Sequence, residues 1–206
     1  MKLAIINYGM GNLASVRRAC TELGASVQIA EHPDALSEVD RIILPGVGGF
    51  AEGAKRLHVG GWKEAIYRQV LGMGKPLLGI CLGMQLLADS SEEGECCSGL
   101  SLIAGQVQHL NKFGCDLRVP HVGWNDINLK FSHPLFAGIT SGTDFYFVHS
   151  YAFKPAVNDC VTANVYYGSE ITAAVISQNI FGVQFHPEKS SKAGRRLLQN
   201  FLNYVS

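Results

Sequence analysis

The segment that most constrains the fold of this chain is a strand that turns sharply into a helix at a cysteine. Residues 76–80 form a short apolar run that enters the sequence GICLGMQ, and apolar residues then recur at helical spacing. A strand that ends in Gly-x-Cys-x-Gly before a helix is a nucleophile elbow, here with sulfur in place of the serine oxygen. Gly79 and Gly83 remove the β-carbons that would obstruct such a turn. The pattern predicts that Cys81 projects into a cleft, where the start of the helix favours the nucleophilic thiolate.

A base for this nucleophile is available near the other end of the chain. Residues 180–185 are predicted to form a strand that runs into His186, Pro187 and Glu188. Because residues two apart on an extended backbone point to the same side, His186 and Glu188 are expected to share a face. A carboxylate behind an imidazole fixes its tautomer and stabilises the imidazolium. Cys81, His186 and Glu188 are therefore a candidate triad; the competing interpretations are a buried structural cysteine and a surface turn.

The order of the predicted elements favours an α/β fold. Strands are expected at residues 3–7, 26–30, 41–44 and 76–80, and Asn12 is expected to cap a helix that ends at Gly24. After about Gly105 the pattern becomes hairpin-like, and a closing helix begins at about Ser191. This predicts three layers around a mostly parallel central sheet, with added antiparallel strands in the second half. One domain, residues 1–206, is expected, and the later strands are placed at residues 106–110, 116–119, 144–149, 161–166, 172–177 and 180–185.

Charge and composition argue against several classes of function. The chain has 17 basic and 17 acidic residues without a long run of like charge, so nucleic-acid binding is not expected. With no signal peptide and no run of about 18 apolar residues, we expect no membrane association and a cytoplasmic location. The six cysteines, including the Cys96-Cys97 pair, are expected to stay reduced. Zinc-type histidine spacing is missing and residues 8–12 lack the third glycine of a dinucleotide fingerprint, so neither a metal nor a cofactor is predicted.

A second glycine-rich loop, PGVG at residues 45–48, follows a strand that should lie beside the nucleophile strand. The backbone N–H groups near Val47 and Gly48 are candidates to join the N–H of Leu82 in an oxyanion hole. Glycines suit this role because they let the chain present its amides at close range. A tight turn is the simpler interpretation of the loop, and the two are compatible.

Together these segments resemble the class I glutamine amidotransferases, which release ammonia from glutamine. The likeness is carried by GICLGMQ around Cys81, PGVG at 45–48 and HPE at 186–188. Within that family, further segments resemble the glutaminase subunits of imidazole glycerol phosphate synthase in histidine biosynthesis. These segments are YGMGNL at 8–13, PHVGWN at 120–125, YFVHSY at 146–151 and HPEKS at 186–190. The resemblance spans nearly the whole chain and implies a class I glutamine amidotransferase-like fold.

The resemblance also implies an activity and a partner. Glutamine would be hydrolysed to glutamate and ammonia through a thioester on Cys81, with Gln85, Ser150 and Tyr151 holding the substrate. The ammonia would pass to a (β/α)8-barrel cyclase that makes imidazole glycerol phosphate and AICAR, with the PGVG loop as the switch that responds to this partner. The two chains would form a heterodimer, and the candidate contact residues are Asn12, Trp124, Asn125, Tyr146 and Lys189.

Two other functions remain open at this point. One is a glutaminase subunit of another synthase, such as that for pyridoxal phosphate, GMP or anthranilate, against which the PHVGWN segment argues. The other is a non-catalytic interaction protein that uses Cys81 as a redox sensor, against which the intact His186 and Glu188 argue. Trp124 has its own alternative, a half-buried core position rather than an interface.

Overall fold

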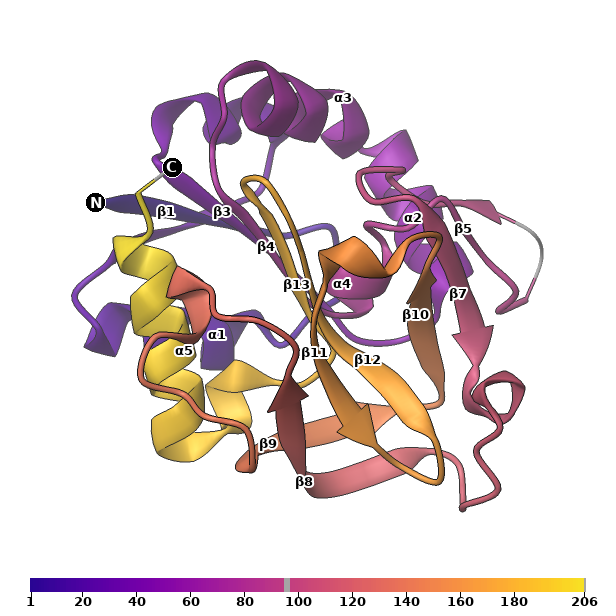
Figure 1. Ribbon diagram of the computed structural model, residues 1–206. Helices are drawn as coiled ribbons and strands as arrows, with labels where there is room; N and C mark the ends of the chain where they lie inside the picture. The colour runs from indigo at the N-terminus through magenta and orange to yellow at the C-terminus, as the bar shows by residue number, and fades with distance from the viewer. Residues whose placement is uncertain (95–96, 206) are drawn as a thin grey trace.

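The computed structural model describes residues 1–94 and 97–205, so Cys96 lies outside the described residues. Its central sheet consists of β1 (Lys2–Ile6), β2 (Ser26–Ala30), β3 (Arg41–Gly46), β4 (Leu77–Cys81), β8 (His121–Leu129), β9 (Thr143–His149), β11 (Val161–Tyr166), β12 (Glu170–Ser177) and β13 (Ile180–Val183). In the described chain these strands lie in the order β2-β1-β3-β4-β13-β12-β11-β8-β9 (Figure 1). The pairs β2-β1, β1-β3, β3-β4 and β4-β13 are parallel, and the remaining pairs of neighbouring strands are antiparallel. The predicted mixed sheet, parallel first and antiparallel later, is confirmed.

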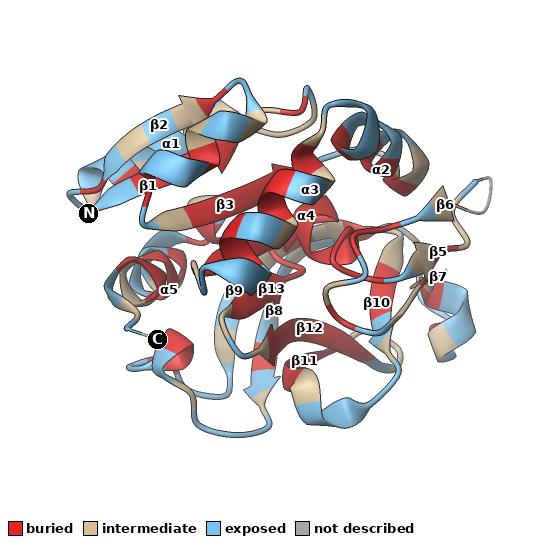
Figure 2. Cartoon of the chain, turned by 90° about the horizontal axis from the view of Figure 1, so that it is seen from above, coloured by how far each residue is buried: buried red, intermediate tan, exposed pale blue. Residues whose placement is uncertain are grey.

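Helices cover both faces of this sheet, as the three-layer prediction requires. The α-helices are α1 (Leu13–Glu22), α2 (Phe50–Val59), α3 (Trp62–Ile66), α4 (Leu82–Gln85) and α5 (Ser191–Asn203). Along β1, Leu3 and Ile5 join the buried cluster that contains α1 and α5, whereas Ala4 and Ile6 join the cluster that contains α2 and α3. This alternation is the two-residue period of a strand buried on both sides. The strands at the centre of Figure 2 are accordingly buried, while the helices expose their outer faces.

A smaller sheet lies beside the carboxyl end of β4. In the described ranges it contains β5 (Ser90–Ser91), β6 (Cys97–Ser98), β7 (Gly105–His109) and β10 (Tyr151–Pro155), in the order β10-β7-β5-β6. Ser150 is the single residue between β9 of the large sheet and β10 of the small one. The segment Ser150–Tyr151 therefore connects the two sheets next to the nucleophile strand.

The structure differs from the predicted elements at four places. Residues 116–119 were expected to form a strand but do not, because Pro120 has no N–H for a sheet ladder and pairing begins only after it, at His121. Strands β8 and β10 were not predicted. Strand β8 exposes alternate residues and contains Gly123, and β10 follows β9 without a turn signal in the sequence. The helix after Cys81 is only one turn long.

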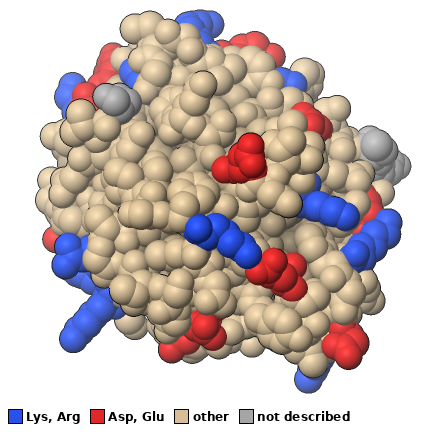
Figure 3. Space-filling model, viewed as in Figure 1, with Lys and Arg blue, Asp and Glu red and all other residues tan. Residues whose placement is uncertain are grey.

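The surface shows scattered charge. On the face in Figure 3, lysine and arginine side chains lie among aspartate and glutamate side chains rather than in one patch. Within the ranges that the structure describes, no helix has both the length and the apolar character needed to cross a membrane.

Candidate active site

Cys81 occupies the strained turn that the sequence predicts. It is the last residue of β4, has φ 55° and ψ −110°, and is buried. Such a conformation is costly for a residue with a β-carbon and is typical of functional sites. The neighbouring glycines are required: a β-carbon at Gly83 would lie 1.8 Å from the carbonyl oxygen of Leu44, and one at Gly79 would lie 2.6 Å from the Gly83 oxygen. The elbow therefore depends on the close approach of α4 to β3 and β4.

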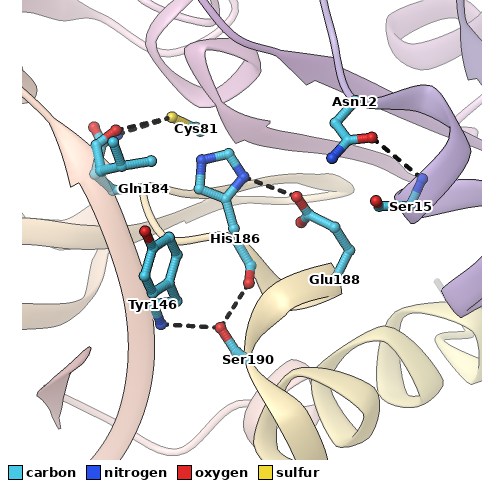
Figure 4. Close-up of polar contacts among 9 residues, drawn as sticks. Asn12, Ser15, Cys81, Tyr146, Gln184, His186, Glu188 and Ser190 are labelled. Carbon is cyan, nitrogen blue, oxygen red and sulfur yellow. Dashed lines mark hydrogen bonds and ion pairs between the residues drawn. The ribbon is translucent and has the colours of Figure 1, made fainter. Parts of the chain in front are cut away.

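His186 and Glu188 meet beside this turn. Strand β13 pairs in parallel with β4, so their carboxyl ends lie together, and His186 comes three residues after the end of β13 at Val183. The Nδ1–H of His186 donates to Glu188 Oε1 at 2.9 Å, and the two side chains are 2% and 1% exposed. In Figure 4 the imidazole lies between Glu188 and Cys81. The predicted contact is present, but Glu188 reaches it from a 3-10 turn, Pro187–Lys189, and not from the extended backbone that we expected.

The imidazole of His186 is held in place and tuned by its neighbours. Its backbone N–H donates to Tyr146 O, while Ser190 Oγ donates to the His186 carbonyl and accepts from the N–H of Tyr146 (Figure 4). Burial alone would lower the pKa of His186, but Cys81 and Glu188 outweigh it and raise that pKa to about 9. Nε2 is buried and has no hydrogen-bond partner among the described residues. It is thus available to a reacting group at the sulfur.

A cavity of about 370 Å³ opens over Cys81 and His186. Every residue predicted for the oxyanion hole or for glutamine binding lines it, although these residues come from three separate segments of the chain. Glu188 is absent from the lining because it lies behind His186. The lining residues are Val47, Gly48, Cys81, Leu82, Gln85, Glu93, Val148, His149, Ser150, Tyr151 and His186.

Of the residues predicted to contact a partner, Trp124 and Asn125 lie on β8, Tyr146 lies on β9, Lys189 lies in the 3-10 turn after His186, and Asn12 precedes α1. Trp124 is 51% exposed and meets Tyr146 edge to face, with 6.1 Å between ring centroids. Lys189 Nζ lies 5.7 Å from the centroid of the Tyr146 ring. Asn12 caps α1 by accepting from the N–H of Ser15, as predicted.

The remaining predicted contact residue, Asn125, points inward. Its Nδ2 donates to Tyr166 O and lies 3.3 Å from His121 Nε2. The side-chain N–H groups of Asn125 therefore form contacts within this chain.

Three residues near the sulfur were missed at the level of sequence. Glu93 lines the cavity, and its Oε2 accepts from the N–H of Phe50 at the start of α2. His149 lies on β9, and Gln184 Nε2 lies 3.7 Å from Cys81 Sγ. Gln184 could have been found, because it precedes His186 by two residues, the spacing at which side chains share a side of an extended segment. Neither Glu93 nor His149 stands at an informative spacing from the triad.

The fold and the site together define a class of protein. The family model "Glutamine amidotransferase class-I" matches residues 4–205. PurLQS from Thermotoga maritima has a similar fold, with a TM-score of 0.72 and 19% identity, over 100% of this chain and 99% of that one. The glutaminase domain of CTPS from Trypanosoma brucei has a TM-score of 0.68 and 18% identity, over 100% and 96% of the two chains. The chain is a class I glutamine amidotransferase.

Sequence relatives define the group within this class. The protein HisH of imidazole glycerol phosphate synthase from Moorella thermoacetica is 47% identical over 199 residues, which cover 97% of this chain and 93% of the relative. The HisH 1 protein of Campylobacter jejuni subsp. jejuni is 44% identical, over 97% of this chain and 98% of the relative. The chain therefore belongs to the HisH family, and its likeness to PurLQS and to the CTPS domain extends to the fold alone.

Proposed function

We propose that this chain hydrolyses glutamine at Cys81, with His186 and Glu188 as its base and orienting carboxylate, and supplies the ammonia to a cyclase subunit. The observation that carries the proposal is the strained Cys81 beside a buried imidazole–carboxylate pair, under a cavity of about 370 Å³. Structural cysteines do not need a disallowed backbone, and surface turns do not bury a carboxylate.

The reaction follows from the protonation of the pair. Because His186 has a raised pKa of about 9, it carries a proton near neutral pH, and its positive charge favours the thiolate form of the neighbouring Cys81. The sulfur attacks the carboxamide carbon of glutamine, and His186 gives its proton to the departing nitrogen, which leaves as ammonia. A thioester remains on Cys81. His186, now neutral, takes a proton from water, the resulting hydroxide attacks the thioester, and glutamate and the thiolate are released.

The oxyanion of each tetrahedral intermediate needs backbone donors. Leu82 is the first residue of α4, so its N–H has no acceptor within the helix. Val47 and Gly48 line the same cavity directly after Gly46, which pairs with Cys81, and Gly48 has a φ of 108°, which L-residues rarely adopt. We assign the oxyanion hole to the N–H of Leu82 together with this loop. Because Val47 is 42% exposed at the mouth of the cavity, the loop is also the segment that a partner protein can reach and switch.

Glutamine is held by polar groups on the walls of the cavity. Both N–H groups of Gln85 are used inside the protein, toward Tyr151 O and Gln184 Oε1, which leaves its own oxygen to accept from substrate. Glu93 contributes a carboxylate to the cavity and suits the α-ammonium group of glutamine. Ser150 and Tyr151 form the wall where the two sheets join.

The partner that we propose is a (β/α)8-barrel cyclase, bound as a heterodimer, which makes imidazole glycerol phosphate and AICAR. The named relatives are subunits of imidazole glycerol phosphate synthase, and this supports the assignment. The exposed Val122 and Trp124 with Tyr146 and Lys189 offer an apolar centre with a polar edge, as interfaces do. Docking there would hold the ammonia away from water.

We also propose a cytoplasmic location. Cys20, Cys81, Cys115 and Cys160 carry free thiols, which fits a reducing compartment.

The test compares glutamine with free ammonia as the nitrogen source for mixtures of this chain and the cyclase. With the wild-type chain, glutamine is expected to support formation of imidazole glycerol phosphate. Cys81→Ala is expected to abolish this while leaving product formation from ammonia and the circular dichroism spectrum unchanged. Glutamine-dependent product with Cys81→Ala, or none with the wild type, would refute the proposal.

A further inference from the structure

Side chains behind the cavity form a continuous hydrogen-bonded chain that ends at the nucleophile. Gln184 Nε2 lies 3.7 Å from Cys81 Sγ (Figure 4), and Gln184 Oε1 lies 3.1 Å from Gln85 Nε2. Gln85 Nε2 lies in turn 2.9 Å from the carbonyl oxygen of Tyr151. Gln85 is 5% exposed and Gln184 is fully buried, so water competes little for these contacts.

The carbonyl of Tyr151 determines which way each amide in this chain points. A carbonyl oxygen only accepts hydrogen bonds, so Gln85 must turn its NH2 group toward it. The other N–H of Gln85 then points at Gln184, so the side-chain oxygen of Gln184 must accept this hydrogen bond. Because its oxygen is committed there, Gln184 has only N–H groups left for Cys81 Sγ. The direction of donation at the sulfur follows from one backbone atom.

A buried histidine, His149, also bonds this carbonyl, and a second buried histidine, His121, bonds His149. His149 Nδ1 lies 2.8 Å from Tyr151 O, so this nitrogen must carry a proton. Burial lowers the pKa of His149 to about 3, and the neutral ring therefore has an accepting Nε2. His121 Nδ1 lies 3.1 Å from that Nε2 and donates to it. Gln85 and His149 together occupy both lone pairs of the Tyr151 carbonyl and fix its direction.

We propose that Gln184 donates a hydrogen bond to the Cys81 thiolate, and that Gln85 and His149 are positioning residues that aim this donor through the Tyr151 carbonyl. The inference rests on the proposed role of Cys81 as the nucleophile. An N–H group binds a thiolate more strongly than a thiol, so this contact favours the reactive form. A stabilised thiolate is a somewhat weaker nucleophile, but with a Brønsted slope of about 0.4–0.5 the larger thiolate population dominates.

The test replaces Gln184 and follows the sulfur without glutamine. Gln184→Met keeps the length of the side chain and removes both the donor to the sulfur and the acceptor for Gln85, whereas Gln184→Glu keeps that acceptor but turns a carboxylate toward the sulfur. Alkylation of Cys81 by iodoacetamide at neutral pH is measured on the peptide that contains Cys81. Gln184→Met is expected to slow it about threefold. The lost hydrogen bond to a charged group lowers the thiolate population about tenfold at the lower end, and the greater nucleophilicity of the remaining thiolate recovers about a factor of three. Gln184→Glu is expected to slow it further. Gln108→Met, which breaks a glutamine pair on β7 away from the site, is the matched control and should leave it unchanged.

Turnover provides a second measurement. Gln184 does not line the cavity and the carbonyl of Tyr151 still orients Gln85, so Gln184→Met should lower kcat about threefold and leave KM for glutamine unchanged. In the wild-type protein, 15N spectra of labelled histidine should show His149 protonated at Nδ1 and unprotonated at Nε2. This spectrum needs no variant, so it tests the direction of donation even if a substitution prevents folding.

Several results would overturn the inference. Alkylation of Gln184→Met at the wild-type rate would do so. A change in KM as large as the change in kcat, together with a lower Tm, would also do so, as would the opposite His149 tautomer. Because alkylation consumes no glutamine, its dependence on Gln184 is separate from the proposed function. A wild-type chain that fails to turn over glutamine would instead refute the function itself.

Discussion

Gly83→Ala should disable the site by moving the elbow, although it adds only one methyl group. A β-carbon at Gly83 would lie 1.8 Å from Leu44 O, and carbon atoms of this kind essentially never approach closer than 3.0 Å. To open that gap, α4 must move away from β3 by roughly 1.2 Å, and overpacking of this kind costs about 1–3 kcal/mol or more. Cys81 immediately precedes α4 and moves with it, and a misplacement of about 1 Å can lower a catalytic rate about 100-fold.

Urea unfolding and glutaminase turnover measure the two parts of this prediction. The control is Gly72→Ala, where an added β-carbon meets nothing within 4 Å and the backbone is not in the left-handed region. It should keep full activity and gain up to about 1 kcal/mol, because the unfolded chain loses freedom. If Gly83→Ala matched the control in stability and activity, the close approach of α4 to β3 would not be what shapes the elbow.

Three further predictions concern the triad and the proposed interface. Glu188→Gln should lower kcat roughly 100-fold or more in a glutaminase assay, because the imidazolium of His186 loses its buried carboxylate partner; a loss under tenfold would contradict this. Since the pKa of His186 is raised from 6.5 to about 9, its contribution to stability is complete below pH 6.5 and is lost as the pH rises through 9. The free energy of unfolding should fall by up to about 3 kcal/mol over that window, and His186→Asn should flatten the curve. Trp124→Ala should weaken binding of the cyclase by about 2 kcal/mol, or roughly 30-fold in Kd by calorimetry, with the rate of Cys81 alkylation unchanged in the free chain.

Strands β1, β3 and β4 in the first half of the chain were predictable because they are buried on both faces and therefore read as short apolar runs. Strand β2 lies at the edge of the sheet and exposes Ser26 and Gln28, yet it was also predicted to the residue, at Ser26–Ala30. Strand β8 was missed because one of its faces is exposed and its residues mix aromatic, polar and glycine types. Strand β10 was missed because nothing in the sequence separates it from β9.

In the candidate site, the residues with a local sequence pattern were predicted, and the contacts between residues far apart in the sequence were not. The triad could be proposed from sequence because a glycine-flanked cysteine and a His-Pro-Glu segment each have a local pattern. The contact between Gln184 and Cys81 spans 103 positions in the chain, and Glu93 meets the cavity from a loop. Such contacts depend on how β13 pairs with β4 and on where the small sheet lies, which residue spacing does not encode.

The role of Cys81 as the nucleophile is tested by mapping where a glutamine-mimicking electrophile attaches to the protein. We expect a single modified peptide that contains Cys81, with labelling prevented by added glutamine and absent from Cys81→Ala. Attachment at another residue while Cys81 stays unmodified, or labelling of Cys81 that glutamine does not slow, would contradict it.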